Sequence, residues 1–109
     1  MRRGDGVVVA LPGEIGKPSP AVIVQSDRLN EHAPSSFLLC PFTTELTAQS
    51  DVRIAVEPEG GNGLLARSEI MIDKVAPAAV RRVGEVIGRL DRPTMRAVDR
   101  ALVMVPGLA

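Results

Sequence analysis

The chain has 109 residues, of which 45% are hydrophobic and 24% charged, so the sequence predicts one globular domain over residues 1–109 and excludes a disordered chain. Thirteen basic and thirteen acidic residues cancel, so no net charge favours nucleic acid or a membrane surface, although a local basic patch is compatible with that balance. A single cysteine excludes an intramolecular disulfide and a cage of several thiolates, and no window approaches the ~20 apolar residues of a transmembrane helix. We therefore expect a cytoplasmic protein.

The first part of the chain predicts three strands separated by turn-forming loops. The strand candidates are VVVAL (7–11), AVIVQS (21–26) and SSFLLCPF (35–42). The first two are nearly continuous runs of apolar and β-branched residues, which is typical of strands that are buried on both faces. PGEIGKPSP (12–20) contains three prolines and two glycines, and SDRLNEHAPS (26–35) is polar, so both segments are predicted to be loops.

Three more strands are predicted at DVRIAVE (51–57), EIMIDKV (69–75) and VGEVIGRL (83–90). In DVRIAVE the apolar residues Val52, Ile54 and Val56 alternate with polar or small ones, which predicts a strand that buries one face. The loop EPEGGNG (57–63) that follows is rich in turn-forming residues, and its GGNG is followed by neither the Lys-Ser/Thr nor the helix that a phosphate-binding loop requires. We predict a turn there.

The last predicted element is a helix over DRPTMRAVDRALVMV (91–105). Asp91 is suited to cap its first turn, and Pro93 is tolerated in that turn. Its apolar stripe at helical spacing is formed by Met95, Val98, Leu102 and Val105. Five or six short strands with one terminal helix, and no helices alternating with the strands, predict a mainly β fold, either a small antiparallel barrel or an open sheet.

The residue types available for chemistry are few. The single histidine, His32, lies in a polar loop and cannot build a multi-histidine metal site. Cys40 lies in an apolar strand, where a cysteine usually acts as a small hydrophobic core residue and not as a nucleophile. We expect no metal and no cofactor. Hydroxyls, carboxylates and arginines at strand ends remain, which alone do not identify a reaction.

Four segments in chain order resemble the MazF/PemK toxins of bacterial type II toxin–antitoxin modules. They are RGDGVVVALPGEIG (3–16), SPAVIVQSD (19–27), LCPFTTE (39–45), and a C-terminal part made of EIMIDKV, VGEVIGRLD and DRPTMRAVDRAL. The similarity extends over almost the whole chain, and the combination is far more specific than any one segment.

This resemblance implies a small SH3-like barrel with a C-terminal helix. It also implies a metal-independent, sequence-biased endoribonuclease that cuts single-stranded RNA, including mRNA, through attack by the 2′-hydroxyl, leaving a 2′,3′-cyclic phosphate and a 5′-hydroxyl. A homodimer neutralised by a cognate antitoxin is implied as well, with DNA contacted only through that antitoxin.

The resemblance also assigns candidate site residues. Thr43 matches the catalytic threonine that follows the proline of the family's third strand, and Thr44 places a second hydroxyl beside it. Glu14 matches a loop carboxylate suited to proton transfer or substrate positioning. Considered without the resemblance, Thr43 and Thr44 at a strand end would be turn residues that hydrogen-bond to the backbone.

One position departs from the family pattern. Ser19 occupies the place of the catalytic arginine at the start of the second strand, and a serine supplies no fixed positive charge. Arg67, which stands at a position that is acidic in the family, or Lys17, two residues before Ser19, is the candidate replacement. We assign Arg67 a catalytic role together with Thr43 and Glu14, and we assign Lys17, Ser19 and Thr44 a role in substrate binding. Losing a preorganised phosphate donor typically costs on the order of 10²–10³ in rate.

Three alternatives follow. The chain is a weak or inactive toxin-fold protein that binds RNA or antitoxin without cleaving, a gyrase poison resembling CcdB, or an unrelated small binding barrel. The CcdB toxins depend on a tryptophan near the C-terminus, whereas this chain has no tryptophan and ends in VPGLA.

Overall fold

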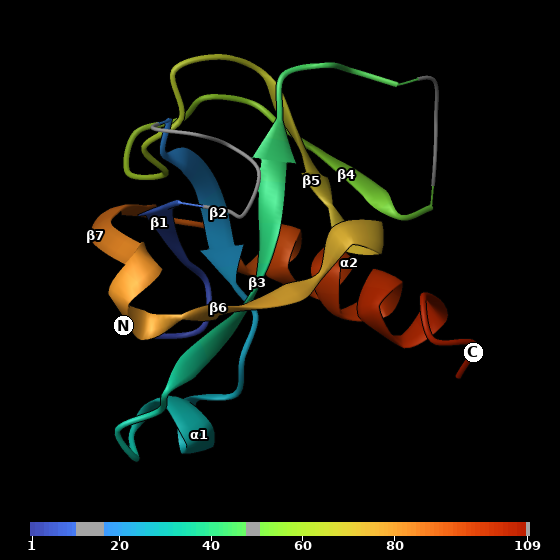
Figure 1. The fold of residues 1–109 in the computed structure, drawn as a ribbon. Coiled ribbons are helices and arrows are strands. Elements are labelled where there is room, and N and C mark those ends of the chain that lie inside the picture. Colours follow the sequence, from blue (N-terminus) through green and yellow to red (C-terminus); the bar gives the residue numbers. More distant parts are fainter. Residues whose placement is uncertain (11–16, 48–50, 109) are drawn as a thin grey trace.

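The computed structural model describes residues 1–10, 17–47 and 51–108 (Figure 1). The strands are β1 (Asp5–Val9), β2 (Ser19–Ile23), β3 (Ser36–Thr43), β4 (Arg53–Val56), β5 (Ser68–Met71), β6 (Ala76–Ala79) and β7 (Val83–Arg89). The helices are α1 (Asp27–Asn30) and α2 (Arg92–Met104), and two 3₁₀ turns lie at Ile72–Lys74 and Val80–Arg82.

The seven strands form one antiparallel sheet in the order β4-β5-β3-β2-β1-β7, with β6 paired to β3 outside this path. β3 is the central strand of the sheet. One edge of β3 pairs with β2, and the other edge is long enough to pair with both β6 and β5. Its first half faces β6, with Phe37 opposite Ala78, and its second half faces β5, with Phe42 opposite Ile70. The mainly β fold with a C-terminal helix is as expected from the sequence.

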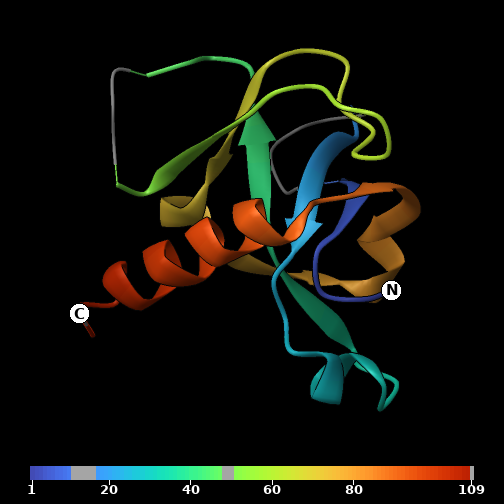
Figure 2. The same cartoon turned by 180° about the vertical axis from the view of Figure 1, so that it is seen from behind.

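The loop between β4 and β5 closes the barrel against β7. Backbone N–H of Arg89 donates to the carbonyl of Gly61 at 2.7 Å. A Cβ at Gly88 would lie 2.3 Å from the carbonyl carbon of Asn62, so the two backbones meet without room for a side chain. We call Gly61–Gly63 and Gly88–Arg89 the closing joint. In Figures 1 and 2 this loop passes the start of β2, at the end of the sheet opposite α1.

β2 lies between two hydrophobic clusters. Val22 belongs to a cluster that packs under α2, whereas Ala21 and Ile23 belong to a second cluster with β1, β3 and β6. All three side chains are fully buried. The prediction that this apolar run is a strand buried on both faces is therefore confirmed.

Helix α2 lies across one side of the sheet, as Figure 2 shows. The carboxylate of Asp91 accepts a hydrogen bond from the backbone N–H of Thr94 at 2.9 Å, which confirms the predicted cap. Val98 is fully buried in the cluster under the helix, and Met95 and Leu102 pack against it.

The predicted apolar stripe is wrong in its last turn. Val105 is 38% exposed, because the end of α2 projects beyond the sheet (Figure 2). Ala101, which is 2% exposed, completes the buried face instead.

Three local predictions differ from the structure. The polar segment 26–35 was expected to be a loop but contains α1, whose first turn is capped by the Ser26 hydroxyl accepting from the N–H of Arg28 at 3.2 Å. The strand expected over 69–75 ends at Met71, where a 3₁₀ turn begins. β6 was not expected, because its sequence APAA lacks β-branched residues; its pairing with β3 is a tertiary contact.

Within the described parts of the chain, no helix is long and apolar enough to cross a bilayer.

Candidate active site

A cleft of about 590 Å³ opens between the start of β2 and the end of β3. Antiparallel pairing causes this meeting, since Ala21 lies opposite Pro41 and the residues just before one therefore face those just after the other. We call this cleft the polar cleft. Its lining includes Lys17, Ser19, Thr43 and Thr44 from the sequence prediction, together with Pro20, Phe42, Glu45 and Ser68. The structure thus brings four predicted residues to one place.

Thr43 is the last residue of β3, and its side chain is half-buried. Its hydroxyl oxygen accepts a hydrogen bond from the backbone N–H of Glu45 at 3.1 Å. This bond occupies a lone pair and not the hydroxyl proton, which a threonine can still donate. The turn-forming role and a donor role are therefore compatible in the same side chain.

The segment after Thr43 is tied to β5 by a buried carboxylate. Glu69 lies opposite Thr43 in the sheet and is only 8% exposed. It accepts hydrogen bonds from the hydroxyl of Thr47 at 3.1 Å and from the backbone N–H of the same residue at 3.3 Å. A buried carboxylate needs such donors. The contact holds residues 44–47 beside the polar cleft.

The two candidate cations lie in different surroundings. Lys17 is exposed and lines the polar cleft. The Arg67 guanidinium Nε lies 3.0 Å from the Glu57 carboxylate, and Arg67 is not among the described residues that line the cleft. Its side chain is 58% exposed, so this ion pair is weak. The structure places Lys17, and not Arg67, beside Thr43, while the catalytic role of either stays a prediction.

The carboxylates of the site comprise one expected and one unexpected residue. Glu14 lies outside the described residues. Glu45 lines the polar cleft and was not selected from the sequence, although its position two residues after Thr43 was a signal that could have identified it. Ser68 was also missed. Its hydroxyl donates to the carbonyl of Ala66 at 2.9 Å, which fixes the wall of the cleft.

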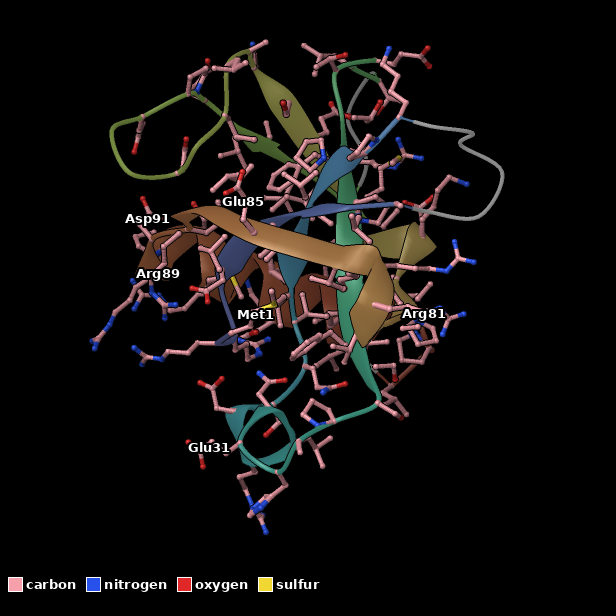
Figure 3. All side chains as sticks on the ribbon, turned by 60° about the vertical axis from the view of Figure 1, so that its left-hand side comes forward. Met1, Glu31, Arg81, Glu85, Arg89 and Asp91 are labelled. Atoms are coloured by element: carbon pink, nitrogen blue, oxygen red, sulfur yellow. The ribbon has the colours of Figure 1, made fainter. Side chains whose placement is uncertain are left out.

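Several arginines are committed to ion pairs away from this cleft. Arg53 contacts Asp73 through two nitrogens at 2.8 and 3.2 Å, and this bond holds the pKa of the Asp73 carboxyl below its usual range. Arg89 contacts Asp5 at 2.8 Å. Figure 3 shows Arg81 and Arg89 at opposite ends of β7, so these two do not form one basic patch.

Among the residues that the structure describes, no group of three or more His, Cys, Asp or Glu is arranged to hold a metal ion.

The chain is similar to several known proteins, among them the following three. A protein of Mycolicibacterium smegmatis named "Probable endoribonuclease MazF" is 40% identical over 110 residues, an alignment that covers 100% of this chain and 99% of the relative. A mycobacterial endoribonuclease solved with its cognate antitoxin superposes with a TM-score of 0.83 at 20% identity, covering 100% of this chain and 97% of that one. A MazF toxin of Mycobacterium tuberculosis gives 0.81 at 21% identity, covering 96% and 98%.

The two solved structures support the fold alone, since their identities are low, but the family follows from sequence. The model of the PemK-like, MazF-like toxins of type II toxin–antitoxin systems matches residues 2–105. That match spans nearly all of the chain, including the described residues that line the polar cleft and both segments of the closing joint. The chain therefore belongs to the PemK-like, MazF-like toxin family of type II toxin–antitoxin systems.

Proposed function

We propose that this toxin is a cytoplasmic endoribonuclease of a single domain, which cuts single-stranded RNA such as mRNA without a metal ion and with a bias for certain sequences. The observation that carries the proposal is the polar cleft, in which a lysine, two threonines and a glutamate meet at the joined ends of β2 and β3. The name of the relative that is 40% identical supports the same activity.

The proposed reaction uses the ribose 2′-hydroxyl as an internal nucleophile. A carboxylate takes the 2′ proton, the 2′ oxygen bonds to phosphorus, and the bond to the 5′ oxygen breaks as that oxygen takes a proton from water in the open cleft. The hydroxyl of Thr43 donates a hydrogen bond to a non-bridging phosphate oxygen, where negative charge develops, and keeps its proton. Glu45 in the cleft or Glu14 takes the 2′ proton. The products are a 2′,3′-cyclic phosphate and a 5′-hydroxyl.

Lys17 is our candidate for the positive charge that Ser19 does not provide. It lines the same cleft as Thr43, whereas the guanidinium of Arg67 is paired with Glu57. An ammonium binds phosphate as a point charge and not in the two-pronged manner of arginine. We therefore expect Lys17 to neutralise the phosphate with less geometric control than the arginine that the family resemblance implies. The hydroxyls of Ser19 and Thr44 then contact the substrate beside it.

A homodimer neutralised by a cognate antitoxin is the second part of the proposal. The last turn of α2 and the residues after it leave apolar side chains uncovered, namely Val103 at 45%, Met104 at 43% and Leu108 at 78% exposure. An uncovered apolar patch suits a protein partner. The mycobacterial structure with a TM-score of 0.83 is described as a complex with an antitoxin. DNA would be contacted only through that antitoxin.

A toxin-fold protein that binds RNA without cutting it is the competing function, and Ser19 at the arginine position is the observation that favours it. The two functions are separated by incubating the purified protein with a long RNA of mixed sequence in EDTA and mapping the new ends. We expect cuts that leave 5′-hydroxyls, and we expect Thr43→Ala to lose them. RNA that stays intact, together with normal growth of cells that express the protein, would exclude the endoribonuclease and favour the binding-only function.

The source of the positive charge is tested by a pair of variants that remove one cation each. Lys17→Ala should lower the cleavage rate strongly, while Arg67→Ala should leave most of it, because the latter residue lies outside the cleft. The reverse ranking would assign the role to Arg67. Ser19→Arg adds a further test: a rise in rate would show that the cleft of the natural chain lacks a strong cation.

A further inference from the structure

A second depression adjoins the polar cleft and differs from it in chemistry. It has a volume of about 360 Å³, and we call it the apolar groove. Its walls come mainly from Pro18, Pro20, Leu64, Leu65, Ala66 and Ile87. Pro20, Thr44 and Ser68 line both depressions, so the two are continuous.

Leu64 and Leu65, neighbours in the chain, have opposite surroundings. Leu64 is half-buried and packs against the hydrophobic cluster under α2, whereas Leu65 is 100% exposed. A fully exposed leucine contributes nothing to the folded core. Because it stands on the wall of an apolar groove beside a polar cleft, its side chain is placed to cover the face of a ligand.

The wall that carries Leu64 and Leu65 is held in place before any ligand binds. The side chain of Asn62 is 7% exposed and makes three hydrogen bonds within the loop. Its amide group donates to the carbonyl of Glu57 at 2.9 Å, and its oxygen accepts from the N–H groups of Glu59 at 3.3 Å and Leu64 at 3.1 Å. A wall fixed in this way loses little entropy on binding.

We infer that the apolar groove binds the nucleobase next to the phosphate that is held at Thr43. This inference rests on the proposed function, since it concerns the same RNA. Single-stranded RNA is recognised through unstacked bases whose flat faces lie against aromatic or apolar side chains. The groove is uncharged and apolar, so it suits a base and not a phosphate.

Position and size support this occupant. Because Pro20, Thr44 and Ser68 are shared, a base in the groove and a phosphate in the cleft can belong to adjacent units of one strand. A volume of 360 Å³ falls within the range of about 300–1,000 Å³ that small-ligand sites usually have. The groove therefore contributes to the choice of cleavage site.

The test combines a protein change with a matching change in the RNA. Leu65→Ser removes an apolar wall whose side chain is fully exposed, so the fold keeps its packing. Leu29→Ser is the matched control, because Leu29 is 61% exposed and lies in α1 at the other end of the molecule. The substrates are a short RNA with one mapped cleavage site and a series in which each nucleotide beside the cut is made abasic in turn.

For the unchanged protein and the Leu29→Ser control, we expect one abasic position to lower kcat/KM at least severalfold, because the apolar contacts of one base with the groove are lost. Leu65→Ser should lower kcat/KM on intact RNA and show a smaller loss from that same abasic position. This non-additivity identifies direct contact between the side chain and the base.

Other outcomes overturn the inference separately from the proposed function. Equal abasic losses in the Leu65→Ser and unchanged proteins would show that no base lies in the groove. A shift in oligomeric state with Leu65→Ser, at unchanged kcat/KM, would assign the groove to a second copy of the chain. If the unchanged protein cuts no RNA, the proposed function fails. The affinities of a short bound RNA and of its single-abasic variants, measured by fluorescence anisotropy for the unchanged and Leu65→Ser proteins, then decide whether a base lies in the groove.

Discussion

The closing joint and the polar cleft lie toward opposite ends of β1 and are built in opposite ways. Gly88 of the joint pairs with Gly6 at the start of β1, whereas Ser19 of the cleft pairs with Val9 at its end. At the joint two backbones touch, so that a Cβ at Gly63 would lie 2.3 Å from the carbonyl oxygen of Ile87. In the cleft, hydroxyls and a lysine border a space of about 590 Å³. The joint leaves no room for change, whereas the cleft leaves its side chains accessible.

This difference separates stability from chemistry within one small protein. The joint closes the barrel, so its residues should determine the free energy of unfolding. The polar residues Lys17, Thr43, Thr44 and Glu45 of the cleft are exposed or half-buried, so their replacement should alter cleavage while the fold stays intact. The first three of the predictions below test that separation.

The largest expected effect is the loss of stability in Gly63→Ala. Gly63 has φ +77°, a backbone conformation that costs other residues about 1–2 kcal/mol, and overpacking against Ile87 adds about 1–3 kcal/mol. We expect the free energy of unfolding, measured with urea, to fall by about 2–5 kcal/mol. Gly60→Ala is the matched control, because a Cβ there meets nothing within 4 Å. An equal loss in both variants would mean that the joint is not closely packed.

Thr43→Val should show the reverse pattern. The valine keeps the shape of the side chain but removes the hydroxyl that we propose as a phosphate donor. Loss of such a donor lowers kcat by on the order of 10²–10³. The free energy of unfolding should change by less than about 1 kcal/mol, since the only hydrogen bond lost among the described contacts is the one accepted from Glu45. A large fall in the urea midpoint would instead make Thr43 a structural residue.

Asn62→Ala probes the joint through hydrogen bonds instead of packing. The change leaves backbone groups of Glu57, Glu59 and Leu64 without their partner. Unsatisfied groups of this kind cost about 1–3 kcal/mol in total when water reaches them partially. We expect a fall in thermal midpoint that is smaller than that of Gly63→Ala. If the fall were larger, the hydrogen bonds and not the close glycine contact would hold the joint.

The smallest expected effect concerns acid, and it lies outside both regions. The Asp27 carboxylate accepts the backbone N–H of Arg3 at 2.8 Å and the Asn30 amide at 3.0 Å, and these bonds hold its pKa below the ordinary 3.8. A lowered pKa stabilises the fold above the unfolded value, and that contribution is lost as pH falls through the folded value. The urea midpoint should therefore drop below roughly pH 4.

Asp27→Asn should make this acid dependence shallower, because the amide does not titrate. The measurement is the urea midpoint at neutral and acid pH for both proteins. If the urea midpoint falls with acid as much in Asp27→Asn as in the unchanged protein, other carboxylates, such as Asp73 beside Arg53, account for the acid sensitivity.

Local patterns predicted the parts of the fold that depend on short stretches of sequence. The apolar run of β2 indicated burial on both faces, and Asp91 with Pro93 indicated where α2 begins. α1 and β6 were missed for a physical reason. The first is a single polar turn capped by Ser26, and the second contains Pro77 and is paired with the first half of β3, which is far away in sequence.

The candidate site was predicted from the family resemblance and not from residue chemistry. That resemblance selected Thr43, Thr44, Ser19 and Lys17, which the structure brings together. It did not select Glu45, whose place in the cleft depends on how the chain leaves β3. Arg67 was assigned a catalytic role and Lys17 only a role in substrate binding, although of these two it is Lys17 that lines the cleft.

The sequence by itself determined the family, the strands with continuous or alternating apolar residues, and the start of the terminal helix, because these depend on contacts within a few residues. Only the tertiary structure decided that GGNG is more than a turn. Its last residues, Asn62 and Gly63, meet β7, and that approach depends on sheet register. Register and closure arise from pairing between distant segments, which local propensity does not encode. The same long-range pairing places the apolar groove beside Thr43.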